Sequence, residues 1–179
     1  MPEDNDIKIY VRKNSGENGD FEALSEDIRR NKTNGNIEKA EALGVKMAQV
    51  TPEDKSLGLS SHTSASLLYQ MRVLMTFTAE YKLRELIKSE FLSDSAVNAM
   101  YDYLKLNERG YYDNISDGGA FTFYLLALKK SGSASENIGA RFADLCSTGS
   151  DEIKKIGADV FEISSELFSR MISAADFAE

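Results

Sequence analysis

The spacing of apolar residues predicts helices along most of the chain. The strongest pattern runs from Ser64 to about Glu90, where apolar side chains recur at helical spacing and cover a broad face. A face this wide is typical of a helix that is surrounded by other helices. We therefore expect this segment to lie at the centre of the fold.

The last pattern, which follows Ser150, is the longest and carries a narrower apolar stripe. The stripe has near-heptad spacing and consists of Ile153, Ile156, Val160, Ile163, Leu167 and Met171. Acidic and basic residues lie between these positions. A stripe of this kind needs a partner groove, so we expect it to pack into the core or against a second copy.

Shorter helical patterns account for most of the remaining chain. Two of them precede residue 50 and are separated by Asn34-Gly35, a sequence that ends helices. Others are centred near residues 98, 124 and 141. Residues 107–117 are predicted to form a loop, and Asp117 can cap the helix that follows it.

The first residues have a different pattern. Ile7, Ile9 and Val11 alternate with polar residues, which is the period of a strand, but no later segment offers a convincing partner strand. Residues 1–20 are therefore predicted to be an extended or flexible N-terminal arm or a short strand. The fold class we expect is all-α: a single helical domain over residues 21–179, built as a bundle of five or six helices that is best defined over residues 60–175.

Charge and composition exclude several classes of protein. The net charge is −8, and such an acidic chain is repelled by nucleic-acid phosphates and anionic lipid. No apolar run approaches the roughly 20 residues that span a bilayer. The acidic start of the chain does not resemble a signal peptide. We expect a soluble, cytoplasmic protein that does not bind membranes.

The residues available for catalysis or metal binding are few. His62 is the only histidine and Cys146 the only cysteine, which is too few ligands for a typical zinc or iron site. We expect no metal and no cofactor. Cys146 ends a helical apolar pattern, so we interpret it as a small packed side chain rather than a nucleophile. The sequence favours a protein without enzymatic activity.

Four residues are candidates for ligand binding. Arg72 lies within the most apolar helical pattern, where a buried arginine requires a carboxylate or a ligand as partner. We favour the alternative that Arg72 faces outwards on a narrow polar stripe. Arg109, Tyr111 and Tyr112 are adjacent, and such residues are frequent in recognition surfaces. Burial of the two rings against the bundle is the other interpretation.

The sequence does not determine a function. We favour a non-catalytic helical protein–protein interaction module, with a homodimer as the default arrangement. The last helix and an apolar face around Met71 and Met75 are the surfaces expected to associate. The alternative is a small-molecule-binding protein or enzyme whose pocket is lined by acids, tyrosines and arginines. A third hypothesis, a helix-turn-helix nucleic-acid regulator over residues 80–104, is disfavoured by the acidity.

Overall fold

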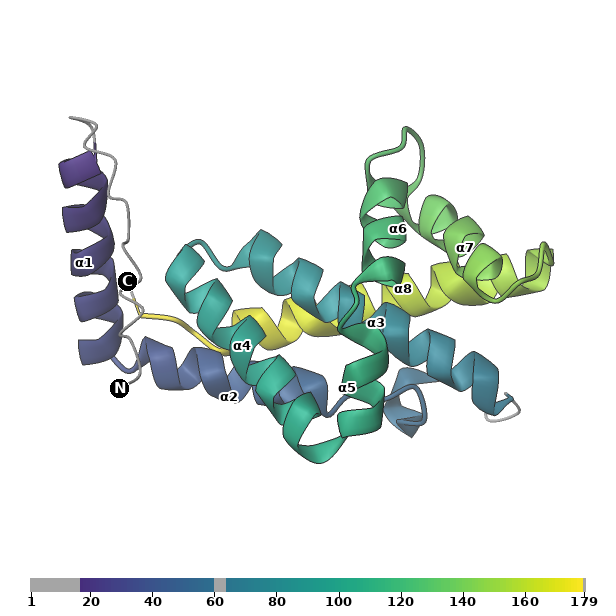
Figure 1. Cartoon of the computed structure of the whole chain (residues 1–179), viewed down its shortest axis with the longest axis horizontal. Coiled ribbons are helices and arrows are strands. Elements are labelled where there is room, and N and C mark those ends of the chain that lie inside the picture. Colours follow the sequence, from purple (N-terminus) through teal and green to yellow (C-terminus); the bar gives the residue numbers. More distant parts are fainter. Residues whose placement is uncertain (1–16, 60–63, 179) are drawn as a thin grey trace, which may run out of the picture.

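The computed structural model describes residues 17–59 and 64–178, and this part of the chain is helical without any strand (Figure 1). The all-α fold class is therefore confirmed. The α-helices are α1 (Glu17–Thr33), α2 (Asn36–Ala48), α3 (Ala65–Leu86), α4 (Glu90–Asn107), α5 (Arg109–Ile115), α6 (Gly119–Leu128), α7 (Ala134–Leu145) and α8 (Asp151–Ala174), and a 3₁₀ turn, η1 (Lys55–Leu57), lies between α2 and α3. The predicted strand at residues 7–11 and the single histidine, His62, lie outside the described residues.

Two differences make the predicted bundle of five or six helices too simple. The segment 107–117 was predicted as a loop, but most of it forms α5. Tyr111 packs against the core there and Ile115 is buried, which favours a helix over an open loop. In addition, α2 packs closely on α4, and its Ala40, Leu43 and Met47 are at most 4% exposed. The core therefore extends into the N-terminal part of the chain.

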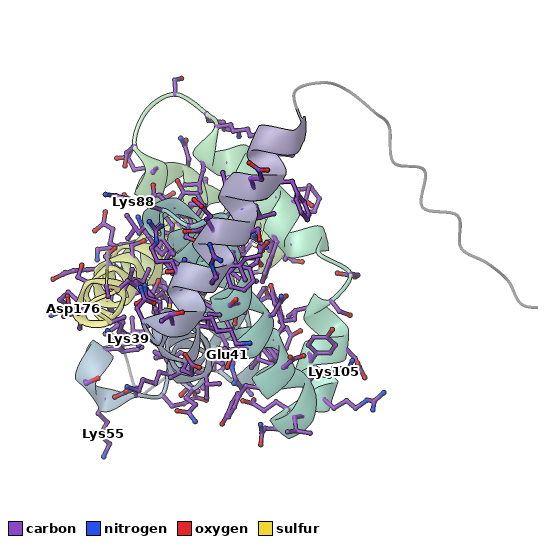
Figure 2. The ribbon with its side chains drawn as sticks, turned by 90° about the vertical axis from the view of Figure 1, so that its left-hand side faces the viewer. Lys39, Glu41, Lys55, Lys88, Lys105 and Asp176 are labelled. Carbon is purple, nitrogen blue, oxygen red and sulfur yellow. The ribbon has the colours of Figure 1, made fainter. Side chains whose placement is uncertain are left out.

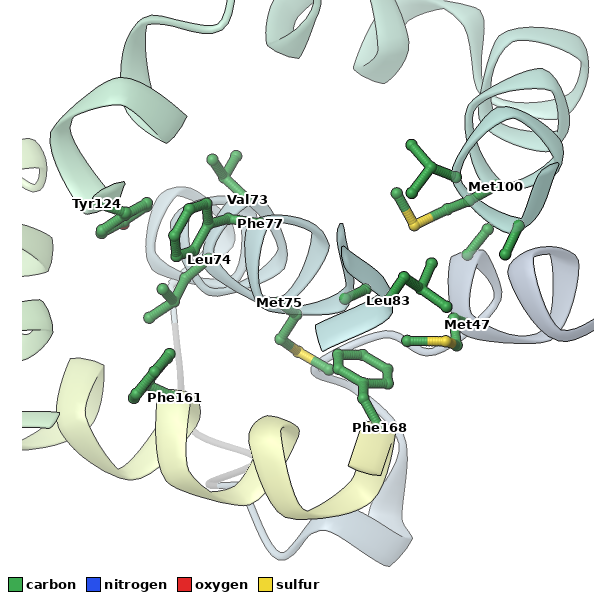
Figure 3. Packing of buried hydrophobic residues seen from close by; sticks show 14 of the residues in the cluster. Met47, Val73, Leu74, Met75, Phe77, Leu83, Met100, Tyr124, Phe161 and Phe168 are labelled. Atoms are coloured by element: carbon green, nitrogen blue, oxygen red, sulfur yellow. The ribbon is translucent and has the colours of Figure 1, made fainter. Parts of the chain in front are cut away.

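Helix α3 is the centre of the core, as its wide apolar pattern predicted. Its buried residues point in nearly all directions from the helix axis: Met71, Val73, Leu74, Met75, Phe77, Thr78, Ala79 and Leu83. Met75 lies against Phe168 of α8, while Phe77 meets Tyr124 of α6 with ring centroids 5.2 Å apart (Figure 3). Met71 and Met75 are each only 2% exposed. The methionine face that we expected to associate with a partner is therefore buried within the chain.

The corner between α3 and α4 is built from serine hydroxyls. Ser89 caps α4 by accepting the Leu92 amide hydrogen at 3.3 Å, so the helix begins at Glu90. Ser93 is buried and donates its hydroxyl to the Leu83 carbonyl at 3.2 Å. Ser93 therefore joins the two helices at their corner instead of capping α4.

Helix α8 packs against α3 and α7, but on a face rotated from the predicted stripe. The buried residues are Gly157, Val160, Phe161, Ser164, Phe168 and Ile172. Of the predicted stripe only Val160 is fully buried, and the other five residues are half-buried. Phe161 and Phe168 are larger than the isoleucines and leucine beside them, so turning them inwards removes more apolar surface from water.

Glycines allow the closest helix contacts. A Cβ atom on Gly44 of α2 would lie 2.0 Å from the Ala96 carbonyl oxygen of α4, and one on Gly139 of α7 would lie 2.3 Å from the Lys154 carbonyl oxygen of α8. Real side chains cannot approach backbone so closely. Gly44, which weakens the helical pattern in the sequence, is therefore required where α2 crosses α4.

We predict that Gly44→Ala lowers the free energy of unfolding by about 1–3 kcal/mol or more, because α2 must move away from α4. Gly110→Ala is the matched control, since a Cβ there meets no atom within 4 Å and alanine is the better helix former. Urea unfolding of both variants measures the difference. Equal stability of the two variants would show that α2 and α4 do not touch at Gly44.

We predict that Phe168→Ala costs about 3–5 kcal/mol of unfolding free energy, the range for deleting a buried phenylalanine. Phe168 is 1% exposed, whereas the neighbouring Leu167 is only half-buried. Leu167→Ala should therefore cost less, under about 2 kcal/mol. Thermal and urea unfolding report both costs, and a larger loss in Leu167→Ala would support the predicted stripe instead of the observed face.

Candidate functional site

Arg72 pairs with a carboxylate from a distant part of the chain. Its Nη2 atom donates to Glu108 Oε1 at 2.6 Å, and its Nη1 atom forms an ion pair with the other carboxylate oxygen. The side chains are 19% and 29% exposed, so both are largely removed from water. Burial opposes the charged form, but Glu108 outweighs it and the pKa of Arg72 is raised. Arg72 therefore stays cationic and is neutralised within the chain.

Tyr111 is the second predicted residue in this cluster. The Arg72 guanidinium carbon lies 4.5 Å from the centre of the Tyr111 ring, a distance typical of a cation–π contact. The Tyr111 hydroxyl shares a 2.7 Å hydrogen bond with Thr76, and its ring meets Tyr69 edge-on at 5.9 Å. Burial raises the pKa of Tyr111, which keeps the phenol neutral. The cluster joins α5 to α3.

The other two candidates lie elsewhere. The Tyr112 ring packs edge-on against Tyr101 with centroids 6.3 Å apart, and Lys105 lies over its face. The Arg109 side chain is 78% exposed and reaches only Asp113, at 3.7 Å. Tyr111 and Tyr112 are consecutive and point about 100° apart in α5, so their rings pack against different neighbours, Arg72 and Tyr101.

Glu108 is the functional partner that sequence reasoning missed. It lies 36 positions after Arg72, so no local spacing links the two residues. A second network on the same side joins α3 to α4, in which Glu80 accepts from the Tyr101 hydroxyl at 2.6 Å and from Arg84 Nε at 3.0 Å. The acids, tyrosines and arginines expected to line a pocket thus bind one another here.

Reactive groups are sparse in the described part of the chain. Cys146 is half-buried, and burial raises the pKa of its thiol, which disfavours the nucleophilic thiolate. Over residues 17–59 and 64–178, no three histidine, cysteine, aspartate or glutamate side chains gather as metal ligands. None of the helices described is both long and apolar enough to cross a bilayer.

Helix α6 carries the clearest exposed apolar surface. It stands beside α7 at the edge of the fold (Figure 1) and buries only Tyr124 and Ala127 fully. Phe123, Leu125 and Leu126 are 46%, 45% and 51% exposed and lie within little more than one helical turn. We call these three residues the α6 face. A single exposed leucine is ordinary, but three large apolar side chains exposed within four residues of one helix are a candidate interaction surface.

Charges border the α6 face without interrupting it. No charged residue occurs between Gly119 and Leu128, while Asp117 precedes the helix and Lys129 and Lys130 follow it. Arg141 of α7 places its guanidinium carbon 5.6 Å from the centre of the Phe123 ring. An apolar centre of aromatic and aliphatic residues with a polar rim is the usual composition of a protein interface.

We predict that Arg72→Ala lowers the free energy of unfolding by about 1.5–3 kcal/mol, because it leaves the half-buried Glu108 carboxylate unpaired. Arg109→Ala, which removes an exposed arginine, should leave stability unchanged. Amide hydrogen exchange should show faster opening of α5 in Arg72→Ala, since seven residues do not form a stable helix alone. A double-mutant cycle of Arg72→Ala and Glu108→Gln that gives no coupling energy would contradict the assigned pairing.

The chain matches no known protein family, and no curated protein or solved structure resembles it. Its function is therefore inferred from its own geometry. Two features described above bear on that inference: the Arg72–Glu108 cluster and the α6 face. The first is closed by contacts within the chain, and the second is open.

Proposed function

We propose that this chain is a non-catalytic helical protein–protein interaction module that docks through the α6 face, and that a second copy of the chain is its partner. The single observation that carries the proposal is the exposure of Phe123, Leu125 and Leu126, each about half accessible to water. Apolar area that remains exposed on a folded domain gains free energy when a partner covers it, by about 25 cal/mol per Å².

An antiparallel arrangement of two α6 helices suits the charges at their ends. Asp113 and Asp117 precede the apolar segment, and Lys129 and Lys130 follow it. In a twofold, antiparallel pair, the lysines of each copy would lie beside the aspartates of the other. The opposed helix dipoles are also favourable in this orientation. Charge complementarity therefore supports self-association despite the net charge of −8.

The size of the α6 face limits the affinity expected of the proposed dimer. A helix of ten residues is about 15 Å long, which limits the area that two copies can bury. Interfaces of small area are typical of transient complexes. The proposed dimer should therefore form at micromolar or higher concentrations and exchange rapidly with the monomer.

The alternative of a small-molecule-binding protein or enzyme has less support. It relied on Arg72, Arg109 or Tyr112 lining a pocket, but both terminal nitrogens of Arg72 already bind Glu108. The Tyr111 hydroxyl is likewise engaged by Thr76. A ligand would have to displace these internal partners before it could bind, at the cost of leaving half-buried groups unpaired.

We predict that sedimentation velocity of the wild-type chain shows concentration-dependent dimerisation and that Leu126→Glu abolishes it. A carboxylate at the centre of the α6 face cannot be desolvated without a partner charge. Leu106→Glu is the matched control, because Leu106 is 85% exposed at the end of α4 and lies outside the α6 face. It should dimerise like the wild type.

Charge reversal provides a second arm of the same experiment. Lys129→Glu combined with Lys130→Glu should weaken the dimer, and added salt should weaken the wild-type dimer through screening of the end charges. A wild-type chain that remains monomeric at all accessible concentrations would contradict the proposal. So would a dimer that Leu126→Glu leaves intact.

A further inference from the structure

Side chains of α2 hold the segment after α8 by hydrogen bonds to its main-chain atoms. The Ala178 amide hydrogen is donated to Asn36 Oδ1 at 2.9 Å, and Asn36 Nδ2 donates back to the Ala178 carbonyl oxygen at 2.8 Å. One turn further along α2, Lys39 Nζ donates to the Asp176 carbonyl oxygen at 2.6 Å. Two side chains of α2, Asn36 and Lys39, therefore bind main-chain atoms of residues 176–178. We call residues 176–178 the strap.

The Asn36 side chain is satisfied by these two hydrogen bonds together with one to Asn31. It is 1% exposed, and its remaining amide hydrogen goes to Asn31 Oδ1 at 2.8 Å, with Asn31 itself 3% exposed. Buried amides without hydrogen-bond partners cost several kcal/mol, about 1–3 for each unsatisfied group. Asn36, at the corner of α1 and α2, thus binds the main-chain N–H and C=O groups of one residue. These hydrogen bonds do not depend on the side chain of the residue that is bound.

The chain turns sharply to reach this corner. Asp176 has φ 48°, in the left-handed region that aspartate adopts more easily than most residues. The turn directs the strap from the end of α8 towards α1 (Figure 1), and Figure 2 shows Lys39 beside Asp176 on that side of the molecule. The strap is therefore a separate segment seated on α2 rather than a continuation of α8.

The strap fills only part of the available space. A groove of about 820 Å³ runs between α1 and the start of α4, with Phe177 and Ala178 among its lining residues. Its other lining residues include Leu24, which is 49% exposed, and Leu86, which is 42% exposed. Apolar surface therefore remains uncovered next to the amide-pairing residues.

A polar contact links the two walls of the groove. Asp27 of α1 accepts from the Ser89 hydroxyl at 2.6 Å, and this contact joins α1 to the start of α4. The Ser89 hydrogen bond, against the opposing effect of burial, lowers the pKa of Asp27, with further help from Arg30 and Asn31. The carboxylate form that makes the contact thus persists throughout the neutral pH range.

We propose that this groove is a binding site for an extended peptide and that the strap is its resident occupant in the isolated chain. The ligand is a peptide segment with an aromatic residue followed by a small residue, because Phe177 and Ala178 occupy these positions. Asn36 and Lys39 would bind its main chain as they bind the strap, as in other peptide sites where main-chain hydrogen bonds supply affinity. A partner segment that also covers Leu24 and Leu86 would displace the strap. The proposal does not depend on the α6 face.

The test uses the full chain and a synthetic peptide with the sequence of residues 172–179. Ala178→Pro keeps the chain length but removes the amide hydrogen donated to Asn36, so the strap is weakened as an internal competitor. Peptide binding is followed by chemical-shift changes in ¹⁵N-labelled protein, including the Asn36 side-chain amide. We expect the peptide to bind the Ala178→Pro variant saturably. Its apparent affinity for the wild-type chain should be about tenfold weaker, because the strap occupies most of the sites.

Matched variants separate the site from general effects. Asn36→Ala in the Ala178→Pro background should abolish binding, whereas Asn98→Ala, which removes an exposed asparagine from α4, should not. Should Asn36→Ala fail to fold, Lys39→Ala or a peptide lacking the phenylalanine serves instead, and each should weaken binding. The proposal is overturned if folded Ala178→Pro shows no shift changes at millimolar peptide, or if the changes persist without Asn36. Neither outcome bears on dimerisation through α6.

Discussion

The burial of α3 is the constraint on which the rest of the structure depends. Eight residues of this helix are buried, and they point to nearly all sides. A helix of this kind cannot be covered by one neighbour, so α4, α6 and α8 must approach it from different directions. α2 and α7 then complete the core by packing on α4 and α8, at contacts that glycines permit. The polar side chains of α3 therefore need hydrogen-bond or ion-pair partners on the neighbouring helices.

Arg72 shows how that requirement shapes a connection. From the sequence we favoured an Arg72 that faces outwards, but in the structure its side chain is largely buried and pairs with the Glu108 carboxylate. Because Glu108 also precedes α5, the pair fixes where α4 ends and α5 begins. The cation–π contact with Tyr111 adds a second attachment for a helix of seven residues. A charge that would be costly when unpaired thus determines the path of the chain.

Sequence reasoning identified helices where the pattern was strongly periodic, although it did not give the buried face of α8 correctly. The helical class, the central place of α3 and the existence of α8 follow from long periodic segments. The buried side of α6 could not be predicted, since apolar residues surround that helix; Tyr124 is buried, whereas the neighbouring Leu125 is 45% exposed. Glu108 and the contacts of Asn36 with Ala178 join residues far apart in the chain, and no local spacing reveals such pairs.

The groove between α1 and α4 and the α6 face are two separate surfaces of the molecule. Figure 1 places α1 at one end of the long axis, and α6 lies towards the other end. One surface is a groove with amide-pairing residues on its floor, which suits an extended segment. The other is a convex helical face, which suits another helix. Because the two share no residue, a partner at one end does not obstruct a partner at the other. Helix α3 and its neighbours lie between these two surfaces, which we propose as separate docking sites.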